Sequence, residues 1–208
     1  QTLEDWERNL NEALAMEPEH LSLYLLEVHQ GTPLAEQLRS GRRPMPDEDA
    51  AAEMYELLLD RTASAGLLQY EISNFAKPGF ESRHNTKYWR LVPVYGFGVS
   101  AHSFDHVRRY WNERDTAAYV KRIEETSSAM AGCEAIDAAS EFVFLGLRLN
   151  QGIDLNEYEQ RFERDLSKTH AAEITRLSEN GLVELAGGTL KLTRKGMLFS
   201  NEVFAEFV

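Results

Sequence analysis

A histidine followed by two aromatic residues makes His84-Asn85-Thr86-Lys87-Tyr88-Trp89 the first segment with the means to do chemistry. Imidazole is the commonest metal ligand in proteins and can bind a haem iron axially. Tyrosine and tryptophan rings beside it offer flat apolar faces for a macrocycle. Clustered aromatic side chains usually serve packing, however. On spacing alone, the segment favours a packing role, with haem ligation as the second interpretation.

A glycine-containing segment, Tyr95–Ser103, is the second candidate, and it reads Tyr-Gly-Phe-Gly-Val-Ser-Ala-His-Ser. Gly96 and Gly98 allow the backbone to approach a ligand closely, and Ser100 can hydrogen-bond an anionic group. Two glycines without a third and a following helix are only a weak dinucleotide signature. His102 fits either a ligand contact or a hydrogen-bonded structural histidine, so the segment alone decides nothing.

Glu71 is the third candidate, because it lies in a predicted strand over residues 70–74. The carboxyl ends of strands in parallel α/β sheets carry binding and catalytic groups. The alternative is a polar network that fixes the geometry of the following loop. No catalytic residue is assigned from these patterns.

Charge and cysteine content exclude several classes of protein. The 208 residues include 34 acidic and 22 basic side chains, and the resulting charge of −12 argues against nucleic acid or an anionic membrane as a partner. Cys133 is the only cysteine, so the chain itself holds neither a disulfide nor a thiolate metal cage. No apolar run approaches the roughly 20 residues needed to cross a bilayer, and we expect a cytoplasmic protein.

The elements that position these candidates follow α/β patterning up to residue 74. Thr2 caps a predicted helix that ends before Pro18, and Asp47 caps a second helix that ends near Ser64. The apolar run Leu21–Val28 predicts a strand buried on both faces. Helices alternating with strands predict a parallel sheet. Two strands are too few to complete it, so we expect the chain to begin partway through an α/β domain.

The remainder of the chain divides into an irregular region and a helical tail. Residues 78–115 predict loops rich in aromatics, and a helix over 116–127 leads into a linker through Gly132. Beyond it, helices over 137–149, 155–162 and 170–180, a hairpin joining 182–185 to 189–192, and a helix capped by Thr193 predict a winged-helix-like unit. Twelve acidic against eight basic residues from position 137 onward make DNA binding unfavourable, so packing or partner contact is the preferred role.

Several motifs taken together resemble those of one family. They are Pro18–Tyr24 (PEHLSLY), Gln69–Ala76 (QYEISNFA), the HNTKYW segment and the GFGVSAHS segment. They resemble the HemW haem chaperones, a branch of the radical SAM proteins related to oxygen-independent coproporphyrinogen III oxidase. The resemblance covers essentially the whole chain.

The resemblance implies an α/β fold: the C-terminal part of a partial (β/α)6 radical SAM barrel over residues 1–132, followed by a small helical, winged-helix-like domain over residues 133–208. In the family, a preceding CxxxCxxC segment holds a [4Fe–4S] cluster that binds S-adenosylmethionine. Cys133 does not match that motif, so the cluster cysteines are absent from this chain.

The resemblance also implies site residues. The family's haem-binding histidine corresponds to His84, with Asn85, Tyr88 and Trp89 completing the motif, which reverses the earlier preference for packing. A cofactor-facing cavity is expected to include Glu71, Gly96, Gly98, Ser100 and His102.

The implied function is haem binding and delivery to haem-accepting proteins, respiratory chain components among them. Peripheral membrane contact is expected only through such acceptors. The alternative is oxygen-independent coproporphyrinogen III oxidation, and a winged-helix interaction module is the third interpretation.

Overall fold

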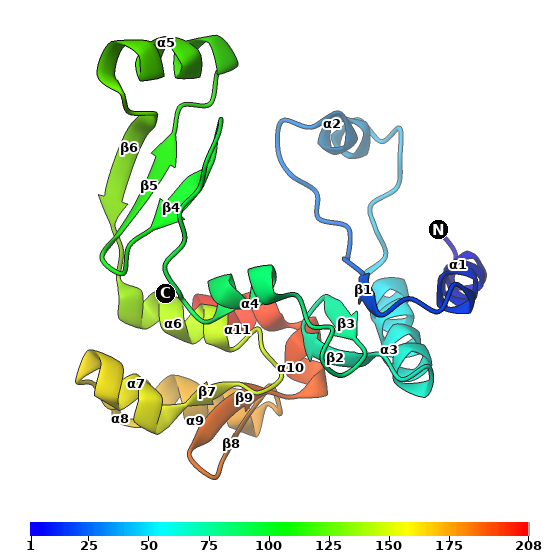
Figure 1. Ribbon diagram of the computed structural model, residues 1–208. Helices are drawn as coiled ribbons and strands as arrows, with labels where there is room; N and C mark the ends of the chain where they lie inside the picture. The colour runs from blue at the N-terminus through cyan, green and yellow to red at the C-terminus, as the bar shows by residue number, and fades with distance from the viewer. Residues whose placement is uncertain (208) are drawn as a thin grey trace. The chain divides into compact units, whose positions relative to one another are not determined.

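The computed structural model describes residues 1–207, and the chain forms two compact units, Gln1–Glu81 and Ser82–Val208 (Figure 1). The domain boundary predicted at residues 132/133 lies inside the second unit and stays a prediction. None of the helices in the described part is long and apolar enough to span a membrane.

The first unit places two capped helices beside a small sheet. Thr2 accepts a hydrogen bond from the Asp5 amide at the start of α1, and Asp47 caps α3 in the same way, as predicted. The Trp6 indole in α1 donates to the Met54 carbonyl of α3 at 2.9 Å, which joins the two helices. The elements are α1 (Leu3–Ala15), β1 (His20–Ser22), α2 (Pro33–Arg39), α3 (Glu48–Ser64), β2 (Leu68–Glu71) and β3 (Asn74–Ala76).

The sheet of the first unit corrects the predicted parallel pairing. Its order is β1-β3-β2, and both outer strands run antiparallel to β3. The two predicted strands do run in the same direction, but β3 lies between them. The expected strand over 70–74 is interrupted after Glu71 by a turn, which lets β3 fold back and pair with β2.

The predicted buried strand Leu21–Val28 is also wrong beyond its first residues. β1 ends at Ser22, and Leu23 adds one amide hydrogen bond to the Ser73 carbonyl at 2.8 Å. Tyr24 and Leu26 are each 67% exposed. An apolar sequence becomes a buried strand only where neighbours pair with it and cover it. In the described part of this unit, no strand pairs with the residues that follow Leu23.

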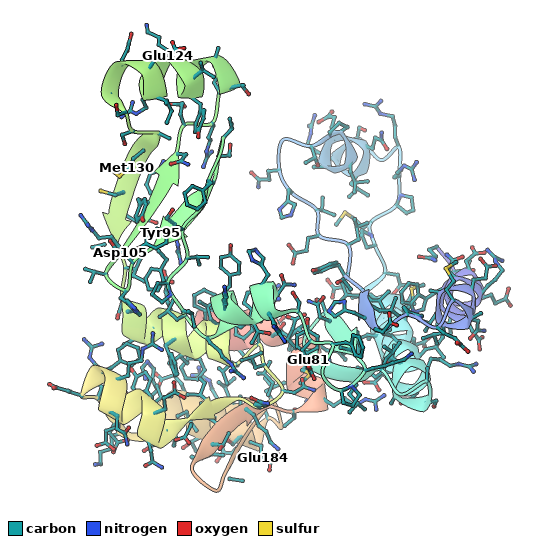
Figure 2. All side chains as sticks on the ribbon, in the orientation of Figure 1. Glu81, Tyr95, Asp105, Glu124, Met130 and Glu184 are labelled. Carbon is teal, nitrogen blue, oxygen red and sulfur yellow. The ribbon has the colours of Figure 1, made fainter. Side chains whose placement is uncertain are left out.

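The second unit begins with a short helix and a sheet-and-helix projection. The region predicted to be irregular contains two strands that pair as an antiparallel hairpin. A third strand begins in the predicted linker and pairs antiparallel with the second of them. The three strands form a sheet of order β4-β5-β6, and we call this sheet with α5 the arm. In Figure 2 it extends from the β4–β5 turn at Asp105 to α5 at Glu124. The elements are α4 (Arg83–Trp89), β4 (His102–Phe104), β5 (Arg108–Asn112), α5 (Thr116–Thr126) and β6 (Met130–Ala135).

The rest of the second unit is a helical domain with a three-stranded antiparallel sheet of order β7-β9-β8. The predicted hairpin is confirmed, and Gly187 and Gly188 both take positive φ at its turn. The core includes Val143, Leu147, Ile153, Tyr158, Leu166, Leu190 and Val203. The winged-helix likeness stays a prediction. The elements are α6 (Ala138–Gly146), β7 (Ile153–Asp154), α7 (Leu155–Phe162), α8 (Leu166–Thr169), α9 (Ala171–Glu179), β8 (Val183–Ala186), β9 (Thr189–Leu192), α10 (Arg194–Leu198) and α11 (Ser200–Ala205).

Candidate functional site

The HNTKYW segment forms α4, and helical spacing divides its side chains into two stripes. Ser82 caps the helix by accepting from the Asn85 amide at 3.2 Å. His84 and Tyr88 are four residues apart and therefore share one stripe, where both are exposed. Their rings meet edge to face, with centroids 5.1 Å apart and an interplanar angle of 80°. Within the second unit, the His84 imidazole makes no hydrogen bond to a described residue and is free to accept a ligand.

Trp89 lies on the other stripe and anchors the helix. The Arg148 guanidinium, just beyond the end of α6, lies over the Trp89 ring at 4.3 Å from its centroid. The Trp89 indole nitrogen is buried and has no hydrogen-bond partner in the part of the chain that the structure describes. The predicted haem-binding residues are thus divided between an exposed pair, His84 and Tyr88, and an anchoring side that includes Trp89, with Asn85 half-buried.

The glycine segment runs along the edge of the arm, and side chains of the arm form hydrogen bonds with its backbone. The Gly96 amide donates to Ser103 Oγ at 2.9 Å, and the Asn112 side chain donates to the Gly98 carbonyl at 2.9 Å. A Cβ at Gly96 would lie 2.3 Å from the His102 carbonyl oxygen, so only glycine fits there. Ser100 takes a positive φ of 60°, and its amide donates to the Glu113 carbonyl.

His102 lies in β4 directly opposite Trp111 of β5. Their rings stack with centroids 6.0 Å apart, and His102 remains exposed. Trp111 in turn covers Gly132 of β6, where a Cβ would meet the indole at 2.5 Å. No described hydrogen bond or ring contact joins His102 to the α4 stripe. The arm therefore presents His102 as a second exposed imidazole, separate from His84 in its contacts.

Glu71 belongs to the first unit and is fully buried, with 0% exposure. Its carboxylate accepts from the Ser73 amide at 2.9 Å and from the Asn74 side chain. These bonds hold the turn between β2 and β3, which is the loop-fixing role weighed from the sequence. The cavity-facing role of Glu71, like those of Gly96, Gly98, Ser100 and His102, stays a prediction.

The residues that sequence patterns missed are those that hold α4 and the arm in place. From the helical domain, Arg148 contacts Trp89 of α4, and Arg161 contacts Leu91 just after the helix. Arg109 of β5 joins the arm to Glu141 of α6. Arginines in an acidic chain resemble ordinary surface residues, and their partners lie far away in sequence. No local signal could have identified them.

The described residues do not fit an iron–sulfur cluster. They contain no group of three or more His, Cys, Asp or Glu side chains placed to hold a metal ion. Cys133, an exposed residue of β6, pairs across the strand with Tyr110 and could offer one thiolate at most.

The chain has the fold of a known radical SAM enzyme, which places it in the class of proteins that share this fold. It superposes along its whole length on the coproporphyrinogen III oxidase HemN from Escherichia coli, with a TM-score of 0.78 and 18% sequence identity, and covers 52% of that chain. Residues 134–199 match the family model of the HemN C-terminal domain.

Within this class the chain is a HemW-like protein. It is 34% identical over 211 residues to the haem chaperone HemW of Bacillus subtilis, covering 100% of this chain and 56% of that relative. It is also 34% identical over 206 residues to HemW of Mycobacterium tuberculosis strain H37Rv, covering 96% of this chain and 50% of that relative. The chain spans about half the length of these curated relatives. The expected family resemblance is confirmed.

Proposed function

We propose that this protein binds haem through His84 and passes it to haem-accepting proteins. The observation that carries the proposal is the exposed His84 imidazole, which has no hydrogen bond within its unit and shares its stripe with the Tyr88 ring. The chain is similar to proteins named haem chaperone HemW, and this similarity supports haem as the molecule that it binds. An exposed ligand suits a carrier, because the iron must be reachable for transfer.

The chemistry required of the chain is limited to binding and release. A neutral imidazole nitrogen donates its lone pair to the haem iron, and the Tyr88 ring offers an apolar edge beside it. Because His84 lies on a helix surface rather than in the core, exchange with an acceptor's ligand needs no unfolding of the domain. Haem-accepting proteins, including respiratory chain components, are the proposed partners.

The alternative, coproporphyrinogen III oxidation, rests on the likeness to HemN. At 18% identity that likeness shows the fold and not the activity. We therefore propose the chaperone function alone.

The test is a haem titration of the 208-residue chain and three histidine variants. His84→Ala is expected to lose the absorption spectrum of histidine-ligated haem, while its far-UV circular dichroism stays that of the parent. His29→Ala is the matched control, since His29 is also exposed but lies in the first unit. His102→Ala tests the second exposed imidazole. An unchanged spectrum in His84→Ala, or its loss only in His102→Ala, would overturn the assignment.

A further inference from the structure

We propose that Arg161 of α7 is a positioning residue that fixes the direction of His84, with Arg148 as its second support. This inference rests on the proposed function, because it concerns the same helix. It assigns the helical domain a part in the haem site.

An unusual residue occupies the position that terminates α4. The Leu91 amide donates to the Tyr88 carbonyl at 3.0 Å, and the Val92 amide donates to the Lys87 carbonyl at 2.9 Å. This pair of bonds is a Schellman motif, which normally has glycine at the left-handed position. Here that position is Leu91, with φ of 50° and its side chain 3% exposed. A leucine adopts this conformation only where other contacts hold it.

Arg161 supplies those contacts from α7. Its guanidinium donates to the Leu91 carbonyl at 3.0 Å and lies 3.5 Å from the Arg90 carbonyl. The same guanidinium lies over the Phe142 ring at 5.1 Å and near the Phe162 ring at 5.5 Å, so two aromatic side chains restrict its orientation. A charged donor in a fixed place therefore meets the two carbonyls that directly follow the last residue of α4.

Arg148 supplies a second fixed point two residues earlier, at Trp89. It covers the Trp89 ring at 4.3 Å. Contacts at both Trp89 and Leu91 set the rotation of α4 about its own axis. His84 and Tyr88 are tied to that rotation by helical spacing, so their stripe points where the two arginines hold it.

The length of α4 makes these supports necessary. The helix has seven residues, and helices this short are marginal in water without tertiary contacts. Without Arg161, we expect α4 to fray from its C-terminal end and His84 to sample several directions. The imidazole would still be present, but haem would be ligated less tightly.

The test compares Arg161→Met with Arg161→Lys and a matched control, Arg164→Met. Methionine keeps the packing against the rings but removes the donor, whereas lysine keeps one charged donor. Arg164 is also near the end of α7, but it pairs with Asp137 at 3.8 Å and has no described contact with α4. The readouts are haem affinity, the spectrum of the bound haem, and hydrogen exchange at the Arg90, Leu91 and Val92 amides without haem.

We expect Arg161→Met to speed exchange at these amides and to raise the haem Kd, each about tenfold, as for the loss of one charge-assisted hydrogen bond. Arg161→Lys should recover part of both losses, and Arg164→Met should match the parent. Parental exchange and affinity in Arg161→Met would overturn the proposal, as would equal losses in Arg164→Met. Faster exchange with parental affinity and spectrum would also overturn it, because α4 would then be supported without directing His84.

Two further outcomes separate this proposal from the haem assignment. If the parent chain binds no haem, the proposed function is wrong, and so is the claim that Arg161 orients a haem ligand. The hydrogen-exchange data would still show whether Arg161 stabilises α4. If Arg161→Met does not fold, Arg161→Lys decides, and parental exchange and affinity in that variant would overturn the need for the two-pronged guanidinium.

Discussion

The Arg109 guanidinium of β5 forms two hydrogen bonds with the Glu141 carboxylate of α6, at 3.0 and 2.7 Å. The Glu141 side chain is only 15% exposed, so water competes weakly for it. This ion pair is a side-chain link between the arm and the helical domain. Two parallel bonds fix an angle as well as a distance, which a single flexible contact does not.

Breaking this link should loosen the arm. We expect Arg109→Met to lower the free energy of unfolding by about 1 kcal/mol, because the pair is only partly shielded from solvent. Hydrogen exchange in the strands of the arm should quicken. Arg108→Met is the control, since Arg108 pairs with Asp105 in an exposed bridge of the same strand. Equal effects of the two substitutions in urea unfolding would contradict a special role for Arg109.

Gly96 should tolerate no side chain. In Gly96→Ala, the new Cβ would lie 2.3 Å from the backbone oxygen of His102, and backbone cannot turn aside as a flexible side chain can. The segment must then separate from β4 and lose the bond to Ser103. We expect a loss of about 2–4 kcal/mol in the free energy of unfolding.

The control for Gly96 is Gly181→Ala in the same unit. Gly181 has a φ of 69° but open space around it, so only backbone strain of about 1 kcal/mol applies. Thermal unfolding of both variants separates steric clash from strain. A Gly96→Ala protein as stable as Gly181→Ala would show that the two segments are not in contact.

Asp165 should give the helical domain an acid-dependent stability. Hydrogen bonds from Lys168 and Ser167 lower the pKa of this α8 cap from 3.8 to about 2. A carboxyl whose pKa is lower in the folded protein stabilises the fold above its usual value and loses that contribution as the pH falls toward 2. We expect Asp165→Asn to have a lower melting temperature than the parent near neutral pH. Near pH 2, where the Asp165 carboxyl becomes protonated, the two melting temperatures should be the same. Thermal melts of both proteins between neutral and acid pH check this expectation. A difference in melting temperature that stays constant across the pH range would contradict it.

Local chemistry explains which elements could be predicted from the sequence. Thr2, Asp47 and Thr193 cap helices through bonds to amides within three residues, so a short window contains the whole signal. The signal for the β8–β9 turn is equally local, because it consists of two adjacent glycines. Each of these predictions is confirmed by the structure.

The arm shows why other elements could not be predicted. β6 reads Met-Ala-Gly-Cys-Glu-Ala, with no β-branched residue, and becomes a strand only because β5 pairs with it. The candidate site divides in the same way. His84 and its neighbours form a recognisable motif, whereas the arginines that hold α4 come from distant positions and share no pattern with it.

The exposed run that follows β1 affects how the protein behaves in concentrated solution. Leu23–Val28 is six residues long, carries a single carboxylate and no proline, and exposes Tyr24 and Leu26. Such a segment can pair edge to edge with the same segment of another molecule and begin aggregation. The charge of −12 keeps copies apart at low ionic strength. Salt screens that repulsion, so aggregation should increase with ionic strength and begin at these six residues.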